Sequence, residues 1–172
     1  VVEGRPGVKS YLIEHAGTQL LWGAVNDSIL ELGRSCIHPS YRSGIILKLL
    51  WYGIAKYIKN QDIKLLIGCV SFSSINLNLI KEEIKYLQNN HTLPDQWMVK
   101  SKQNNKILFN GDNIYCNEKV FNKLPPLLKG YLKMGGMVSD EYYIDYQFKT
   151  IDCFIAVFID QINKKYKNKF LN

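Results

Sequence analysis

The sequence predicts an α/β protein with a central β-sheet and helices packed against it. Three features indicate this class. A strand-like segment, a helical pattern and a continuous apolar run follow one another between residues 28 and 72. Two more apolar, strand-like runs lie near the C-terminus, at 142–148 and 150–159. Such alternation of strand and helix patterns is typical of an α/β domain.

The first strand–helix–strand unit sets the direction of two strands. Residues 28–37 are predicted as a strand, which ends before Pro39 because proline cannot donate to a ladder. Ser43 is the expected N-cap of a helix over 45–59, whose apolar residues recur on one face. The run 63–72 has the apolar character of a strand buried on both faces. A crossover of this kind requires parallel strands.

The remaining elements follow from the same periodicities. A helix is predicted over 75–88, capped by Ser73 and Ser74, with Ile75 and Leu79 on its apolar face. Residues 89–105 are polar and predict a loop. The shorter predicted elements are a strand at 106–109, a turn at 110–113, a helical turn at 117–123, a helix from Leu124 to Met134 and a basic helix at 160–170.

Composition limits the classes of function. The chain has 172 residues, 47% hydrophobic and 22% charged, which fits one globular domain and excludes a mostly disordered chain. It has no apolar run long enough for a transmembrane helix, and residues 1–10 lack the apolar segment of a secretory signal. The net charge of +7 favours nucleic acid, anionic lipid or acidic substrates as partners. Alternatively, it reflects only the abundance of Lys, Asn and Ile that an AT-rich genome produces.

The cysteines indicate neither a metal site nor a disulfide framework. Cys36, Cys69 and Cys153 lie in apolar strand-like runs, and no cysteine pair or histidine has the spacing of zinc ligands. Free cysteine in such runs packs as a small apolar residue. We therefore expect buried thiols in a reducing cytoplasm.

Two segments are candidates for chemistry. Glu31 lies in an apolar strand, where a buried carboxylate must be paired or functional. It is a general base, a partner of Arg34, or a side chain in water on an edge strand. At strand period, Glu31 and Gly33 face one side and Arg34 the other. Arg42, Ser43 and Gly44 open a helix directly after a strand. Helix N-termini bind phosphate, although an ordinary helix start explains the same residues.

Two weaker candidates lie downstream. Lys129-Gly130-Tyr131 precedes Gly135-Gly136, which the sequence favours as an ordinary helix C-terminus. Asp152 lies inside the apolar run 150–159 and is a second buried carboxylate. It is the next candidate for a base after Glu31.

Four blocks of sequence carry a resemblance to one family. They are ELGRSCIHPSYRSG, LLWYGIAKY, LLIGCVSF and PPLLKGYLKMGGMVSDEYYIDYQFKTIDCF. They resemble, in this order and over residues 29–170, the ornithine Nα-acyltransferases of bacterial ornithine-lipid biosynthesis, often described as hemolysin-like. These belong to the Gcn5-related N-acetyltransferase (GNAT) superfamily. The resemblance implies a mixed central sheet with flanking helices, and a domain over 29–172 after an unassigned segment 1–28.

The resemblance also implies a reaction and its residues. A 3-hydroxyacyl chain moves from acyl carrier protein to the α-amine of ornithine, giving lyso-ornithine lipid. Glu31 would accept the amine proton and Arg34 would position it. The backbone of Ser35, Cys36 and Ile37 would bind the pantetheine arm. Arg42, Ser43, Gly44 and Ile45 would hold the donor phosphate. No metal and no permanently bound cofactor is implied, because the acyl group arrives on phosphopantetheine.

Two departures from the family pattern leave alternatives open. The donor loop is shorter than the usual R-x-x-G-x-G. The fold also places three strands and a helix pair before its fourth strand, and residues 1–28 cannot hold them. We therefore expect an N-terminally truncated chain, a degenerate copy or a sheet that a partner completes. An acetyl-CoA-dependent small-molecule N-acetyltransferase and an inactive fragment remain as alternatives.

The expected partners are acyl carrier protein and ornithine, in the cytoplasm. Four lysines at 164, 165, 167 and 169 leave open a peripheral contact with the anionic inner membrane, since each nearby lysine adds about 1 kcal/mol at such a surface. A non-catalytic basic domain would use the same charges. The sequence contains no recognised nucleic-acid-binding motif, so no nucleic-acid partner is expected.

Overall fold

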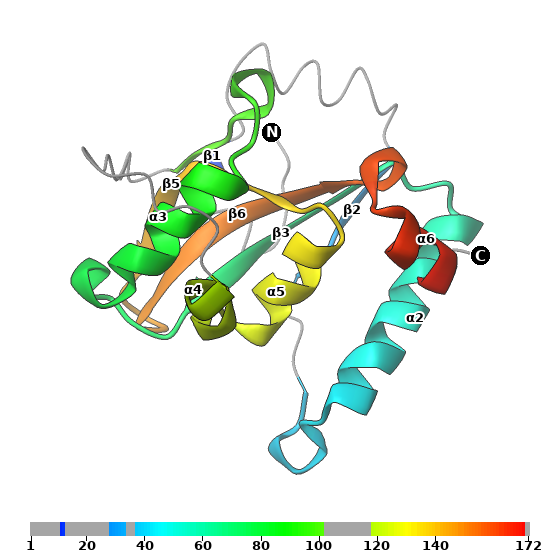
Figure 1. The fold of residues 1–172 in the computed structure, drawn as a ribbon, viewed down its shortest axis with the longest axis horizontal. Coiled ribbons are helices and arrows are strands. Elements are labelled where there is room, and N and C mark those ends of the chain that lie inside the picture. The colour runs from blue at the N-terminus through cyan, green and yellow to red at the C-terminus, as the bar shows by residue number, and fades with distance from the viewer. Residues whose placement is uncertain (1–10, 13–27, 34–36, 102–117, 171–172) are drawn as a thin grey trace.

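The computed structural model describes residues 11–12, 28–33, 37–101 and 118–170, around a four-stranded sheet (Figure 1). The strand order is β2-β3-β6-β5, formed by Ile29–Glu31, Leu65–Phe72, Thr150–Phe158 and Met137–Asp145. β2 and β3 are parallel, while β6 runs antiparallel to both of its neighbours. The predicted parallel pair and the predicted C-terminal strand pair are both confirmed, and the sheet is mixed.

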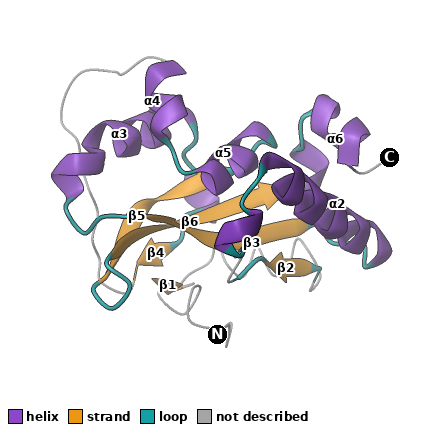
Figure 2. Cartoon of the chain, turned by 90° about the horizontal axis from the view of Figure 1, so that it is seen from below, coloured by secondary structure: helices purple, strands orange, loops and turns teal. Residues whose placement is uncertain are grey.

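The described helices cover one face of the sheet, and a small ladder covers the other (Figure 2). These helices are α2 (Gly44–Asn60), α3 (Lys81–Asn90), α4 (Glu118–Lys123), α5 (Pro126–Lys133) and α6 (Lys164–Phe170). On the opposite face, β1 (Tyr11–Leu12) pairs antiparallel with β4 (Lys100–Ser101). The sheet therefore separates two packed layers.

Each face of the sheet has its own core because side chains alternate along a strand. In β3, Leu66 and Val70 belong to the core under the helices, whereas Leu65 and Ile67 belong to the core on the other face. β6 is buried on both faces from Ile151 to Phe158. The prediction that the run 63–72 is a strand buried on both faces is confirmed, and the structure shows the same for β6.

Helix α2 begins as the sequence predicts. The Ser43 side-chain oxygen accepts a hydrogen bond from the Ile46 backbone N–H at 3.4 Å. This satisfies one of the donors that every helix N-terminus leaves without an intrahelical partner. Trp51, Ala55 and Ile58 repeat at helical spacing and form the buried face of α2. They fix this helix over β3.

The predicted helix at 75–88 begins too early. Residues Leu77–Ile80 form a 3₁₀ turn, and α3 starts only at Lys81. The Asn76 side chain accepts from the Asn78 N–H at 3.0 Å, so local side-chain bonding competes with an α-helical start. As a result Ile75 and Leu79, predicted on the buried face, are 45% and 71% exposed.

Three other boundaries differ from the prediction. The predicted loop 89–105 contains β4, which a buried carboxylate holds: Glu141 accepts from the Ser101 N–H at 2.7 Å. β5 starts at Met137 rather than at 142, with a register shift between Val138 and Tyr142. α6 starts at Lys164 because the Asn163 side chain caps it. The strand and turn predicted at 106–113 lie outside the described residues.

Gly136 is the glycine that the end of α5 requires, and its replacement should weaken the fold. A Cβ there would lie 2.8 Å from the Tyr131 carbonyl oxygen, which belongs to a helix and cannot move away. We expect Gly136→Ala to lower the free energy of unfolding by about 1–3 kcal/mol, the cost of overpacking. Urea denaturation measures this.

Gly53→Ala is the matched control. A Cβ at Gly53 meets nothing within 4 Å, and the residue lies inside α2. Alanine there should raise the free energy of unfolding by about 0.5–1 kcal/mol, because glycine loses more backbone entropy in a helix. Equal effects from the two substitutions would contradict the packing at Gly136.

Candidate active site

An apolar groove lies between the N-terminal half of α2, the loop before it and α5. Its volume is about 740 Å³. This is within the range of small-molecule and cofactor sites. The residues that line it are Ile37, Arg42, Ser43, Gly44, Leu47, Leu50, Trp51, Ile54, Pro126, Leu127 and Tyr131.

The loop before α2 brings a cation and a helix N-terminus to one end of this groove. A 3₁₀ turn at Pro39–Tyr41 reverses the chain, and the Arg42 Nε donates to the Ile37 carbonyl oxygen at 3.0 Å. That bond uses one of five guanidinium donors. Gly44 leaves open space, since a Cβ on it would meet nothing within 4 Å. An anion here would meet both the Arg42 charge and the positive end of α2.

The far wall of the groove depends on one aromatic contact. The Trp51 indole of α2 and the Tyr131 ring of α5 pack edge to face, with centroids 5.1 Å apart. Gly130 allows this approach, because a Cβ on it would lie 3.2 Å from the indole. The glycine therefore lets α5 pack close enough to α2 to complete the groove.

The Tyr131 end of the groove lies close to the end of the described β2–β3 ladder. Paired residues run from Ile29–Leu65 to Glu31–Ile67, and the Leu32 N–H adds one bond to the Ile67 carbonyl. The Tyr131 hydroxyl lies 3.8 Å from the Cβ position of Gly68, the next residue of β3. Burial raises the pKa of Tyr131 far above its usual range, so its O–H remains a donor at neutral pH.

Glu31 lies on the opposite face of the sheet from this groove. Its Oε1 is 3.2 Å from the Cβ position of Gly33, which confirms that both face the same side. The neighbouring Leu30 and Leu32 pack toward the helices instead. Glu31 is half-buried. The sheet edge thus carries the groove on one side and a carboxylate on the other.

Two further polar groups share the face of Glu31. Cys69 lies on it, and its pKa is raised, first by burial and then by the charges of Asp152, Cys153 and Glu31. Asp152 is 8% exposed, and burial raises its pKa while hydrogen bonds from Ser71 and Thr150 oppose that shift. The sequence-based prediction that Asp152 is buried is confirmed.

The structure brings together most of the predicted donor-binding residues that it describes. Ile37, Arg42, Ser43 and Gly44 all line the groove. The Ile45 side chain is 72% exposed and does not, so any role of this residue is confined to its backbone. Arg34, Ser35 and Cys36 lie outside the described residues.

Sequence reasoning missed the second wall of the groove. The sequence predicts Trp51 only as part of a helix, and it favours an ordinary helix end over a functional role for the segment that contains Gly130 and Tyr131. The structure places Trp51 and Tyr131 in the lining. The sequence signal for this wall is the block PPLLKGYL. It carries part of the family resemblance, but the resemblance assigns no role to its residues.

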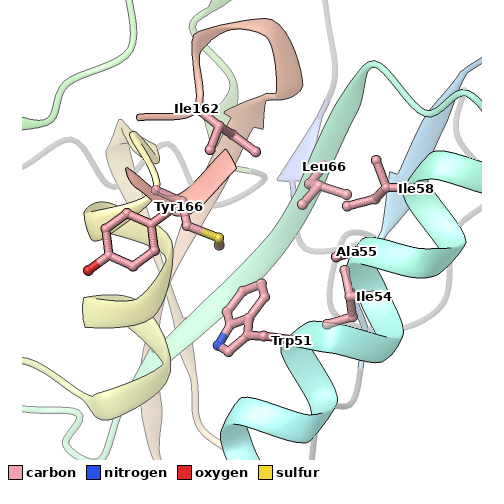
Figure 3. Close-up of a pocket in the computed structure, with 8 residues that line it drawn as sticks. Trp51, Ile54, Ala55, Ile58, Leu66, Ile162 and Tyr166 are labelled. Atoms are coloured by element: carbon pink, nitrogen blue, oxygen red, sulfur yellow. The ribbon is translucent and has the colours of Figure 1, made fainter. Parts of the chain in front are cut away.

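A second, much smaller space behind Trp51 is part of the core packing (Figure 3). It holds about 20 Å³ and is lined almost entirely by apolar atoms from α2, β3 and the C-terminal region, among them Ile58, Leu66, Ile162 and Tyr166. An apolar void of this size stays dry and holds no ligand. Trp51 thus separates the core from the groove.

The described residues contain neither a candidate metal-binding cluster nor a candidate membrane-spanning helix. Among the residues whose structure is described, no three His, Cys, Asp or Glu side chains gather where a metal ion could bind. Within the same ranges, no helix combines the length and apolar character needed to cross a membrane.

Comparison with known proteins agrees with this geometry. A family model described as an acetyltransferase (GNAT) domain matches residues 13–52, which includes the strand β2 and half of α2. The L-ornithine N(alpha)-acyltransferase of Brucella abortus is 34% identical over 146 residues, covering 82% of this chain and 51% of the relative. That of Rhizobium meliloti is 32% identical over 162 residues, covering 91% and 54%.

The chain is homologous to the L-ornithine N(alpha)-acyltransferases. The resemblance seen in the sequence is thereby confirmed, and the mixed sheet with flanking helices agrees with the GNAT fold. The enzyme of Rhodobacter capsulatus is a third relative, 27% identical over 139 residues. The chain spans about half the length of the curated relatives it matches. No solved structure shows significant similarity to it.

The buried thiols give a test of the structure around the site. Burial raises the pKa of Cys153 to about 12 and that of Cys69 further still. Only the thiolate is alkylated rapidly, so both thiols should resist iodoacetamide at pH 8 in the native protein. Mass spectrometry should find both modified after denaturation in urea. A stoichiometric disulfide among Cys36, Cys69 and Cys153 would contradict the predicted reduced state.

Proposed function

We propose that this chain carries the catalytic part of an L-ornithine Nα-acyltransferase, which moves a 3-hydroxyacyl group from acyl carrier protein to the α-amine of ornithine and yields lyso-ornithine lipid. The observation that carries the proposal is the groove from the N-terminus of α2 to the end of the β2–β3 ladder. Its relatives are named L-ornithine N(alpha)-acyltransferases, which supports ornithine as the acceptor.

The donor binds in the groove with its phosphate at α2. Arg42 and the backbone N–H groups at the start of α2 meet the phosphate, with Ser43 and Gly44 shaping the turn. The pantetheine arm then runs along the apolar lining toward Tyr131. Ser35, Cys36 and Ile37 provide backbone hydrogen bonds along this path, as the family resemblance implies.

The acceptor approaches from the other face of the sheet, where Glu31 lies. An α-amine is mostly protonated at neutral pH, so it needs a proton acceptor before it can attack a thioester. Glu31 takes that proton, and Arg34 positions the carboxylate. The amine nitrogen then bonds to the thioester carbon, and the carbon–sulfur bond breaks.

The leaving thiolate needs stabilisation, and the Tyr131 hydroxyl is placed to donate a hydrogen bond to it. Its hydroxyl lies beside Gly68, at the end of the groove where the thioester would stand. Burial keeps this phenol protonated, as its raised pKa shows. The thiolate takes the second proton, which the attacking nitrogen loses as the amide forms, directly or through solvent, and Glu31 releases the first proton to solvent.

Loss of the Arg42 side chain should weaken donor binding. Arg42→Ala removes the cation beside the helix N-terminus, and a charge-assisted hydrogen bond is worth about 1.5–3 kcal/mol. We expect acyl carrier protein affinity to fall by about 10- to 150-fold, measured by calorimetry with the acylated carrier. Lys149→Ala, an exposed lysine in the β5–β6 turn, is the control. Unchanged affinity in Arg42→Ala would refute the phosphate position.

Loss of the Glu31 carboxylate should slow turnover without loss of donor binding. General-base catalysis contributes about 10²- to 10⁴-fold, so Glu31→Gln should reduce kcat by this factor at pH 7. The deficit should shrink as the pH rises, because a larger fraction of ornithine then carries a free α-amine. A full rate at pH 7 would make Glu31 structural, and Asp152→Asn would then be the next variant to assay.

The donor class is decided by the same assay. Turnover with a long-chain acyl carrier protein and none with acetyl-CoA supports the proposal. The reverse result would make the chain a small-molecule N-acetyltransferase. Turnover with neither, in a chain that still binds the carrier, would show that the chain has no activity of its own.

A further inference from the structure

Helix α2 carries an exposed apolar stripe that its packing does not use. The stripe runs along one side of the helix at spacings of three and four residues, from Ile45 through Leu49 to Tyr52. Ile45 is 72% exposed and Leu49 is 58% exposed. Leu50 and Tyr57 lie beside it and are also exposed, and Tyr41 precedes it. Contiguous exposed apolar residues of this kind mark interaction surfaces.

The same helix is basic along its outer side. Lys48, Lys56 and Lys59 are all exposed, and α2 contains no Asp or Glu. The Lys48 ammonium lies 5.8 Å from the centre of the Tyr52 ring. Positive charge and apolar surface are therefore interleaved on one helix face, as in helices that lie in a membrane interface.

Helix α6 adds to this surface. It lies beside the C-terminal half of α2 (Figure 1). Lys164, Lys165 and Lys167 are exposed, and α6 contains no acidic residue. We use the name α2–α6 surface for the following exposed residues of the two helices: Ile45, Lys48, Leu49, Tyr52, Lys56, Lys59, Lys164, Lys165 and Lys167.

The surface is continuous with the donor groove. A shallow apolar groove of about 530 Å³ runs along α2 and is lined by Leu30, Leu32, Ile46, Leu49, Leu50, Gly53, Ile54 and Tyr57. Leu50 and Ile54 also line the donor groove. The shallow groove therefore adjoins the donor groove at Leu50 and Ile54, and it adjoins the α2–α6 surface at Leu49.

We propose that the α2–α6 surface docks on an anionic lipid bilayer. The inference rests on the proposed function in one respect, since a lipid product would leave along the shallow groove into the bilayer. Ile45, Leu49 and Tyr52 enter the interface, while the lysine side chains reach the headgroup phosphates. Their combined charge matches an anionic surface, and the absence of acidic residues from both helices removes the repulsion that would oppose it.

Vesicle flotation of the full 172-residue chain tests the proposal. One set of vesicles contains phosphatidylcholine alone, and the other contains about one third phosphatidylglycerol. We expect binding to the anionic set, with little binding to the neutral set. Rising salt should weaken it, because the electrostatic part is screened within a Debye length.

Two double variants test the two components of the surface. Leu49→Ser with Tyr52→Ser removes apolar contact, and we expect at least tenfold weaker binding. Lys48→Glu with Lys56→Glu should weaken binding by about fivefold or more for each lysine. All four side chains are exposed, so the fold should tolerate the changes, and circular dichroism checks this.

The matched controls change the same residue types elsewhere. Leu79 and Tyr146 are each 71% exposed but lie on the 3₁₀ turn before α3 and on the β5–β6 turn. Leu79→Ser with Tyr146→Ser should keep full vesicle binding. Lys100→Glu with Lys149→Glu, at exposed lysines outside both helices, controls for net charge.

The outcomes separate this inference from the proposed function. Binding that falls in the α2 variants and not in the controls supports docking, even if no acyl transfer is found. Absence of binding to anionic vesicles, or equal binding by all variants, overturns docking and leaves the acyltransferase proposal standing. If the α2 variants instead lose affinity for acyl carrier protein and the unmodified chain does not bind vesicles, the surface is a protein-docking site. The membrane-docking proposal is then wrong.

Discussion

The contact between the Trp51 indole, Gly130 and the Tyr131 ring holds the candidate site together. Trp51 is the first buried side chain of α2, and it lines both the groove and the small core space behind it. Because Gly130 has no side chain, α5 can approach the indole and bring the Tyr131 hydroxyl over β3. Without that approach, the donor groove would have one wall, formed by α2 alone.

The sheet gives the site two sides. Side chains alternate along β2, so Leu30 and Leu32 point toward the helices and Glu31 points away from them. The described β2–β3 ladder ends beside Gly68, close to the Tyr131 end of the groove. A donor on one face and a proton acceptor on the other can therefore meet at the end of the ladder. In the proposed reaction, this separation would keep the Glu31 carboxylate away from the donor phosphate, which it would otherwise repel.

Helix α2 has three surfaces with different physical roles. Its N-terminus presents backbone N–H groups beside Arg42, its inner side fills the core, and its outer side exposes apolar residues among lysines. A helix of 17 residues is long enough for all three, since each surface needs only a few positions at helical spacing. One element thus carries both the proposed phosphate position and the proposed lipid-facing surface.

The sequence alone determined the parallel β2–β3 pair, the Ser43 cap, the burial of β3 on both faces and the loop that lines one end of the groove. These features depend on short-range rules, namely side-chain period, capping and the direction a crossover imposes. It could not locate the start of α3, because Asn76 offers the backbone a competing local bond. Only the tertiary structure decided that Trp51, Gly130 and Tyr131 meet. Residues 51 and 131 lie 80 positions apart, and no local pattern encodes a contact that depends on how α5 packs against α2.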